Sequence, residues 1–312
     1  MKWFGAHIKK GRLGLSYTDK HVSLVVVKPA TGGKPKIEMA QVAQVSMRNL
    51  SGMKSVISHA AIKSFPCNAV LNVEQYQIIQ VDKPNMPDAE VKPALKWKIK
   101  ELLDYQVENA TVDGVDIPTD PANPNRLPFM FAVCAKNSQL AELSNGLLDA
   151  GVNLKSIDVH ALVQRNVAAL LEQDARVLVM VSMLERGCLV TFTAGGELYQ
   201  TRLIELDRGF MMDLNGDLFN SNLDRLVLEL QRSLDSFDRQ FPYLTINRLL
   251  VAPDIGAERL VDVLKNSLYL PVESFSLADI VELPDDEEYI SPEKQALLLP
   301  ALGAALRMEG DA

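Results

Sequence analysis

Glu229 and Arg232 are the pair of side chains in this 312-residue chain whose types and spacing most suggest chemistry. They stand three residues apart in the segment 226–242, so on a helix they share one face and could hold a polar ligand together. The same spacing also allows ordinary surface ion pairs, Glu229 with Arg225 and Arg232 with Asp235. Both interpretations require this segment to be a helix, and its apolar residues at three- and four-residue steps predict one.

Other reactive side chains do not form a recognisable catalytic or metal-binding motif. The four histidines are His7, His21, His59 and His160. None has the short spacing of a metal-binding pair. Ser16 and Ser182 lack the Gly-x-Ser-x-Gly context of a hydrolase nucleophile. The stretch 213–217 has its glycine misplaced for a calcium loop and is better explained as a loop before a helix. We therefore expect no catalytic residue and no metal site.

The composition favours a cytoplasmic protein with a large core. The chain is 47% hydrophobic and carries a formal charge of −8, from 40 acidic and 32 basic residues. No basic face predicts nucleic-acid binding. Its three cysteines are far apart, which fits a reduced compartment. No window reaches the roughly 18 to 20 apolar residues of a membrane span. Residues 1–12 mix Trp3 with lysines, so they could rest on an anionic membrane surface or form a ragged end before the first strand.

The order of predicted elements is repeated along the chain. Three strand-like runs, Leu13 to Tyr17, Val22 to Lys28 and Lys36 to Val45, precede a helix from Ser51 to Lys63 and a buried strand from Cys67 to Val73. Three more runs, Val177 to Met183, Cys188 to Thr193 and Glu197 to Ile204, precede the long helix and the strand Arg248 to Ala252. Such a duplication predicts an α/β fold of two similar halves.

Several segments resemble PilM, the actin-like protein of type IV pilus assembly. The wording Glu-Leu-Gln-Arg-Ser-Leu-Asp at 229–235 is similar to its signature helix, and Ala301-Leu-Gly-Ala-Ala-Leu-Arg307 resembles its closing segment. Further similarity lies at 95–107, where a tryptophan precedes Tyr-Gln-Val, and at 135–165, so the resemblance covers roughly residues 90 to 307. The opening Met-Lys-Trp-Phe looks most like MshI, the PilM-like component of the MSHA pilus system.

The resemblance implies an actin-like, ribonuclease H-like fold of two duplicated lobes with an inserted subdomain. We expect a tail at 1–11, a first half at 12–173 with an insertion at about 76–128, and a second half at 174–312.

Actin-like ATPases hold a triphosphate between two hairpins that carry Asp-x-Gly, and this sequence departs from both. The first aspartate falls on Gly14 and its glycine on Ser16, while the second motif falls on 180–182 and ends at Ser182. Only Gly256 stands near the expected adenosine glycines. The resemblance implies a degenerate nucleotide site, and weak ATP or ADP binding stays open. Its residues would be Ser16, Tyr17, Thr18, Asp19, Ser182, Glu229, Arg232 and Gly256.

The implied function is that of a scaffold without enzymatic activity. PilM resemblance implies a cytoplasmic protein at the inner-membrane face that binds the tail of a bitopic PilN-like protein and meets other pilus platform components. Trp97 and Tyr105 could anchor that tail or pack within the insertion. The alternative is an active actin-like ATPase or small-molecule kinase with a rearranged phosphate loop, in which Asp19 is the nearest acidic substitute. The sequence does not decide whether the protein belongs to a pilus system or to a secretion system.

Overall fold

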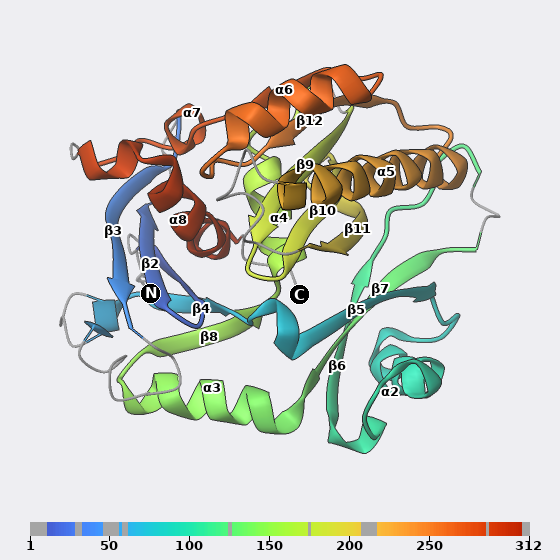
Figure 1. The fold of residues 1–312 in the computed structure, drawn as a ribbon. Coiled ribbons are helices and arrows are strands. Elements are labelled where there is room, and N and C mark those ends of the chain that lie inside the picture. The colour runs from blue at the N-terminus through green and yellow to red at the C-terminus, as the bar shows by residue number, and fades with distance from the viewer. Residues whose placement is uncertain are drawn as a thin grey trace, which may run out of the picture.

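Three β-sheets organise the chain (Figure 1). The computed structural model describes residues 11–28, 33–45, 56–57, 62–123, 127–173, 176–206, 217–284 and 287–307. The predicted tail, except Gly11, and most of the predicted helix from Ser51 to Lys63 lie outside the described residues.

The first sheet has the order β3-β2-β1-β4-β8. Its strands are β1 (Arg12–Tyr17), β2 (His21–Lys28), β3 (Lys36–Gln44), β4 (Pro66–Val70) and β8 (Asn153–Asp158). The first three form an antiparallel meander, and β4 and β8 continue the sheet in parallel. β2 is a nearly continuous run of valine and leucine because helices cover both faces of the sheet.

The second sheet repeats this order as β11-β10-β9-β12-β13. Its strands are β9 (Val177–Leu184), β10 (Gly187–Ala194), β11 (Glu197–Glu205), β12 (Ile246–Val251) and β13 (Val272–Ser274). Again a three-stranded antiparallel meander is followed by two parallel strands. The repeat expected from the sequence is thus present in the strand order of the two sheets.

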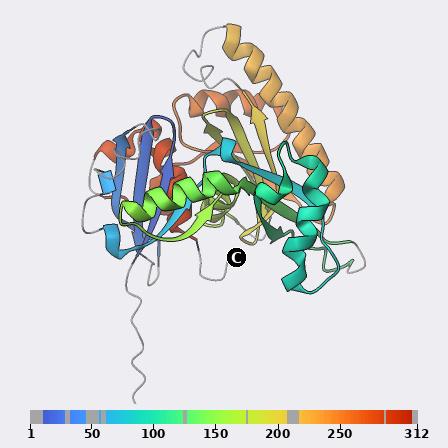
Figure 2. The ribbon, with the colours of Figure 1, turned by 90° about the horizontal axis from the view of Figure 1, so that it is seen from below.

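The third sheet lies to one side of the other two and has the order β5-β7-β6 (Figures 1 and 2). Its strands are β5 (Tyr76–Asp82), β6 (Ala110–Asp116) and β7 (Phe129–Lys136). Helix α2 (Asp88–Ile99) packs on its outer face, with short 3-10 turns at Lys100–Leu102 and Val107–Asn109. Because β7 is the central strand, this sheet extends past the boundary at about residue 128 that the sequence suggested.

The two large sheets exchange helices. Helix α3 (Asn137–Asp149) covers one face of the first sheet, while α5 (Asp217–Gln240) and α6 (Ala257–Ser267) cover one face of the second. Helix α4 (His160–Ala168) leaves the first half of the chain to pack on the second sheet, and α8 (Pro292–Ala305) returns to the first sheet. The short helices are α7 (Leu277–Ile280), η1 (Ile62–Ser64), η2 (Val73–Gln75) and η6 (Glu287–Ile290).

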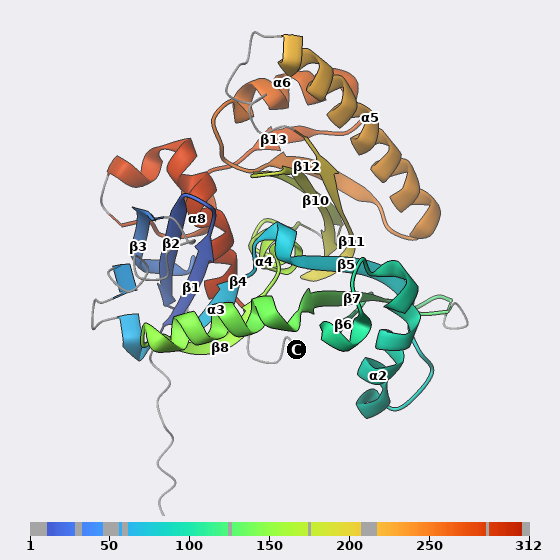
Figure 3. The ribbon, with the colours of Figure 1, turned by 60° about the horizontal axis from the view of Figure 1, so that its bottom comes forward.

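Helix α8 lies between the two large sheets and joins them into one core (Figure 3). Val25 of β2, Met180 of β9 and Leu302 of α8 belong to the same buried cluster. A division of the chain at residue 173 therefore separates the strands of the two lobes but not the helices that cover them.

Candidate functional site

Helix α8 occupies the space beside the first hairpin. Gly14 of β1 lies directly against it: an ideal Cβ on Gly14 would stand 1.8 Å from the Ala301 carbonyl oxygen. No side chain fits there without moving β1 or α8, which explains why the position where an aspartate was expected holds glycine.

The other residues predicted at the first hairpin differ in solvent exposure. Ser16, Tyr17 and Thr18 line a cavity between the lobes, whereas Asp19 is exposed on the turn between β1 and β2. The Tyr17 hydroxyl donates to Gln75 Oε1 at 2.5 Å, and burial raises the pKa of Tyr17 to about 12. Tyr17 is thus held as a buried, neutral hydrogen-bond donor.

Ser182 of the second hairpin is engaged in a buried network under α4. Its hydroxyl donates to Gln164 Oε1, while Gln164 Nε2 donates to the Met180 carbonyl at 3.0 Å and to Thr191 Oγ1 at 2.9 Å. The network therefore ties the second hairpin to α4, and the Ser182 hydroxyl proton is engaged by Gln164.

The cavities between the two hairpins are small. One, of about 50 Å³, lies beside Ser16 and Tyr17, and the other, of about 20 Å³, lies beside Ser182. Both are bounded by His160 and by Pro300 of α8. Ligand pockets typically measure about 300–1,000 Å³. In this conformation, neither cavity has room for a nucleotide.

His160 is buried where the lobes meet. Its ring stacks on that of Tyr76, with centroids 6.3 Å apart, and its Nδ1 has no hydrogen-bond partner among the described residues. Burial lowers the pKa of His160 to about 4, although a hydrogen bond with the Leu71 backbone opposes this shift. The imidazole is therefore neutral near pH 7.

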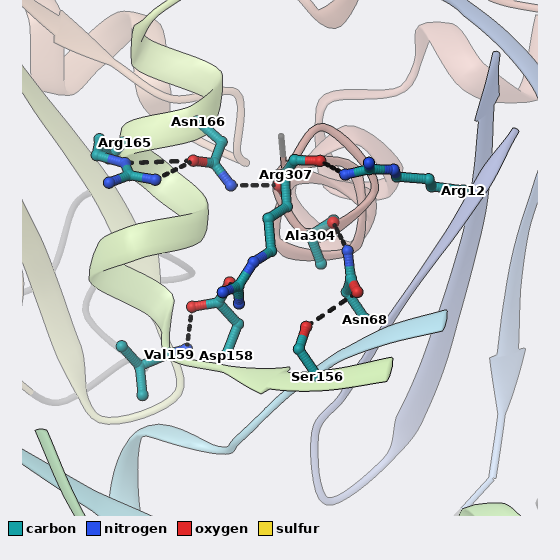
Figure 4. Close-up of polar contacts among 10 residues, drawn as sticks. Arg12, Asn68, Ser156, Asp158, Val159, Arg165, Asn166, Ala304 and Arg307 are labelled. Atoms are coloured by element: carbon teal, nitrogen blue, oxygen red, sulfur yellow. Dashed lines mark hydrogen bonds and ion pairs between the residues drawn. The ribbon is translucent and has the colours of Figure 1, made fainter. Parts of the chain in front are cut away.

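Side chains from three elements hold the C-terminal end of α8 (Figure 4). Asn68 Nδ2 donates to the Ala304 carbonyl and Asn166 Nδ2 to the Gly303 carbonyl, each at 2.9 Å. Arg12 Nη1 donates to the Arg307 carbonyl. These donors add hydrogen bonds to carbonyls at and just after the end of α8, where the Ala304 carbonyl otherwise accepts a long bond of 3.4 Å from the Arg307 N–H.

Asp158 and Arg307 form the charged part of the same network (Figure 4). Arg307 Nη1 lies 3.1 Å from Asp158 Oδ2, and the Val159 backbone N–H donates to Asp158 Oδ1 at 2.9 Å. Burial raises the pKa of Asp158, and the Arg307 charge opposes that rise. The C-terminal segment is thus fixed to the end of β8 by an ion pair.

The structure corrects the prediction for Glu229 and Arg232. Glu229 is paired with Arg202 of β11 and with Arg232, whose Nη1 is 2.7 Å from Glu229 Oε1. The expected pairs with Arg225 and Asp235 were wrong, because Glu229 contacts both Arg232, three residues further along α5, and Arg202 on the neighbouring strand β11. Glu229 and Arg232 line neither cavity beside the hairpins.

Gly256 precedes α6 with φ 76°, a left-handed conformation that glycine adopts readily. It lies three residues after Pro253, which borders the smaller cavity. A backbone requirement therefore accounts for this glycine without a ligand.

A larger groove of about 470 Å³ follows one edge of β6, and the sequence did not reveal it. Residues 113–116 line it in succession, with Val91 and Lys92 of α2 on one side and Leu162 and Arg165 of α4 on the other. These residues come from separate segments, so no local pattern marks them.

Neither predicted anchor lines this groove. Trp97 is 76% exposed on α2, and Tyr105 is half-buried against the core of the third sheet, with Lys136 Nζ 4.9 Å from its ring centre. Tyr105 therefore packs within the insertion, which was one of its two expected roles.

Three further features bear on the chemistry of the chain. Within the described ranges, no group of three or more His, Cys, Asp or Glu side chains is placed to hold a metal ion. Cys67, Cys134 and Cys188 are all free and buried. No helix in the described part of the chain is both long and apolar enough to cross a membrane.

Two sheets of the same strand order, joined by exchanged helices and carrying an inserted third sheet, define an actin-like fold. Among solved structures, a chain of the "PilM-PilN type IV pilus biogenesis complex" is similar, with a TM-score of 0.74 and 18% identity, over 95% of this chain and 99% of that one. A Bacteroides thetaiotaomicron protein described as having an "actin-like ATPase fold and unknown function" gives a TM-score of 0.51 and 10% identity, over 88% of this chain and 94% of that one. No protein-family model and no curated protein matches the sequence significantly.

Proposed function

We propose that this protein is a cytoplasmic scaffold of a type IV pilus or related secretion platform at the inner membrane, without enzymatic activity of its own. Its partner is the cytoplasmic tail of a bitopic PilN-like protein. The observation that carries the proposal is the contrast between small cavities at the hairpins and a groove of about 470 Å³ along the edge of β6. The similarity to a chain from a PilM–PilN complex supports the choice of partner.

The edge of β6 is suited to accept an extended peptide. β6 pairs with β7 on one side and with no strand on the other among the described residues. The Ile117 N–H bonds to the Phe129 carbonyl of β7 at 3.1 Å, so the N–H groups of Asp116 and Gly114 point to the other side. The Gly114 N–H is covered by the Asp113 side chain, at 2.8 Å. An incoming strand would extend the sheet from three strands to four.

The walls of the groove favour an uncharged segment. On the insertion side, Lys83 pairs with Asp116 at 2.6 Å and Lys92 with Asp113 at 2.9 Å.

On the opposite wall, Arg165 lies 3.9 Å from Glu197 and Arg307 lies 3.1 Å from Asp158. Because each basic group already has an acidic neighbour, a charged peptide would gain little, while Leu162 and Met130 offer apolar contact. The partner segment is therefore expected to be extended, apolar and uncharged over about four residues.

Calorimetric titration of the PilN-like tail peptide into the full chain tests this proposal. Asp116→Pro removes one edge N–H, and Asp116→Ala is the matched control because both variants lose the ion pair with Lys83. Loss of one backbone hydrogen bond, about 1 kcal/mol, predicts roughly fivefold weaker binding for Asp116→Pro than for Asp116→Ala. Equal affinities would exclude strand pairing at β6, and no heat with the wild-type protein would refute the proposed partner.

Absence of ATP hydrolysis is the second part of the proposal. The alternative, an ATPase or kinase that uses Asp19, requires the lobes to open far beyond the cavities of about 50 and 20 Å³. A magnesium-ATP turnover assay with the wild type and Asp19→Ala distinguishes the two. Turnover lost in Asp19→Ala would establish the enzyme, whereas we expect none in either protein.

The finer assignment, to an MSHA-like pilus, rests on the resemblance of Met1 to Phe4 to MshI. Deletion of the gene in its host should abolish MSHA-type pili, and intact pili would exclude this assignment.

A further inference from the structure

The outer face of α2 carries exposed apolar side chains next to lysines. Trp97 is 76% exposed, and Leu102 in the turn that follows is 56% exposed. Lys100 Nζ lies 5.7 Å from the centre of the Trp97 ring, and Lys96 immediately precedes Trp97 in the chain. Large exposed side chains grouped in this way mark a contact surface more often than a bare solvent face.

The C-terminal part of α2 is rich in lysine in a chain that is acidic as a whole. Residues 91–100 contain four lysines and no acid, although Asp88 and Glu90 stand in the first turn of α2 and Glu101 follows it, while the formal charge of the chain is −8. Lys92 is paired with Asp113 at 2.9 Å, and Lys98 lies 3.8 Å from Asp82. No ion pair to Lys96 or Lys100 is present among the described residues. The end of the helix beside Trp97 therefore carries the positive charges of Lys96 and Lys100, which form no ion pair within the described part of the chain, and the nearby negative charge of Glu101 reduces the net positive charge there.

Trp97 points away from the side of α2 that borders the groove. Val91 and Lys92 line the groove; at about 100° per residue, Trp97 lies about 140° round the helix from Lys92, and Lys96 lies between them, about 40° from Lys92. In Figure 3, α2 stands on the outside of the third sheet, away from the two lobes. On the proposed function, a membrane protein's tail would occupy the adjacent groove and leave Trp97 free near the lipid surface.

We propose that the outer face of α2 docks on an anionic lipid surface. A tryptophan ring suits the interface between headgroups and acyl chains, Leu102 adds apolar contact, and lysine stems can extend so that their charges meet lipid phosphates. Each lysine near an anionic surface strengthens partitioning by about fivefold. The acidic remainder of the chain is repelled by the same surface, so the contact also orients the molecule with the insertion towards the membrane.

Vesicle binding of the full chain alone tests this proposal. The chain has two tryptophans, so Trp3→Phe leaves Trp97 as the single tryptophan, whose emission can be excited selectively at long wavelengths that tyrosine does not absorb. With phosphatidylglycerol-containing vesicles, we expect co-sedimentation and a blue shift of Trp97 emission, and neither with phosphatidylcholine alone. In that background, Lys96→Gln with Lys100→Gln should weaken partitioning by at least tenfold, and Glu101→Gln should strengthen it.

The matched control makes the same change in charge elsewhere. Lys155→Gln with Lys265→Gln removes two exposed lysines on β8 and α6, and this variant should keep most of the binding. Equal loss in both double variants would mean general electrostatic attraction and would overturn the proposal. So would full binding without Lys96 and Lys100, because the N-terminal lysines would then be responsible.

A protein contact at the same face is distinguished by the tail peptide. If Trp97→Ala abolished peptide binding but left vesicle binding unchanged, the face would serve a protein partner and the proposal would fail. The vesicle assay contains no peptide, so its failure would leave the proposed scaffold function standing, and failure of the peptide titration would leave the lipid contact standing.

Discussion

A single methyl group added at Gly14 tests how tightly α8 closes the space between the lobes. The ideal Cβ would lie 1.8 Å from the Ala301 carbonyl oxygen and 2.7 Å from the Ala305 nitrogen. Ordinary carbon–oxygen contacts lie at about 3.3–3.6 Å, so β1 and α8 would have to separate by roughly 1.5 Å. Both opposing atoms belong to the backbone, so a change of rotamer cannot relieve the contact.

The expected cost follows from this geometry. Overfilling a packed core costs about 1–3 kcal/mol when side chains can adjust. Here two buried backbone segments must move, so we expect Gly14→Ala to lower the free energy of unfolding by more than about 3 kcal/mol. Ser16→Ala, two residues along the same strand face, is the control and should cost less than about 1 kcal/mol.

Urea unfolding followed by circular dichroism measures both variants. A second change, Ala301→Gly, removes a side chain but not the carbonyl, so it should not rescue Gly14→Ala. A variant within about 0.5 kcal/mol of wild type would refute the reasoning, since it would mean that α8 withdraws easily and that the cleft can open. Gly14→Asp, which restores the acidic residue expected from the resemblance, should destabilise at least as much and should not create magnesium-ATP binding.

Two further predictions concern the lobe junction. Because the pKa of His160 is lowered to about 4, from about 6.5 in an unfolded chain, its contribution to stability is complete above pH 6.5 and is lost as the pH falls towards 4. The stability lost between pH 7 and pH 5 should amount to about 2 kcal/mol, and His160→Gln should flatten this part of the pH profile of urea unfolding; parallel profiles would contradict it. Asn68→Ala removes the short bond to the Ala304 carbonyl, which keeps the bond from the Arg307 N–H at 3.4 Å, and removes the acceptor of the Ser156 hydroxyl. It should cost about 2 kcal/mol by the same measurement, whereas no loss would mean that water replaces the amide.

The strand order was accessible from the sequence because it depends on local patterns. Mainly apolar runs bounded by turns located β2 and β10, and the repeated order of elements indicated duplicated sheets. The long helix was recognised from its apolar spacing, although it begins at Asp217, before the predicted start.

The helix exchange depends on contacts that no local pattern encodes. The stretch from Ala296 to Leu306 is apolar on most sides because α8 is enclosed by both sheets and α4, but its composition does not say which sheet it covers. Gly14 illustrates the difference: its sequence position showed a lost aspartate, and only the packing of α8 explained the loss.

Candidate site residues could be predicted where they belong to one sequence motif. They could not be predicted where the fold brings together residues from distant segments. Glu229 pairs with Arg232 on its own helix and with Arg202, 27 residues away on β11, and not with Arg225; the contact with Arg202 is the one that helical spacing could not predict. The β6 groove draws on several separate segments, among them Lys83, Asp113 and Leu162, and appears once the third sheet is placed against α4.

On the proposed function, the protein acts through the β6 groove and not through a nucleotide between its lobes. The decisive measurement is a structure of the protein with both the PilN-like tail peptide and magnesium-ATP supplied. We predict density for an extended peptide hydrogen-bonded to Asp116 as a fourth strand of the third sheet, with α8 still against Gly14. Phosphates seated between the two hairpins, with α8 displaced, would contradict the claim.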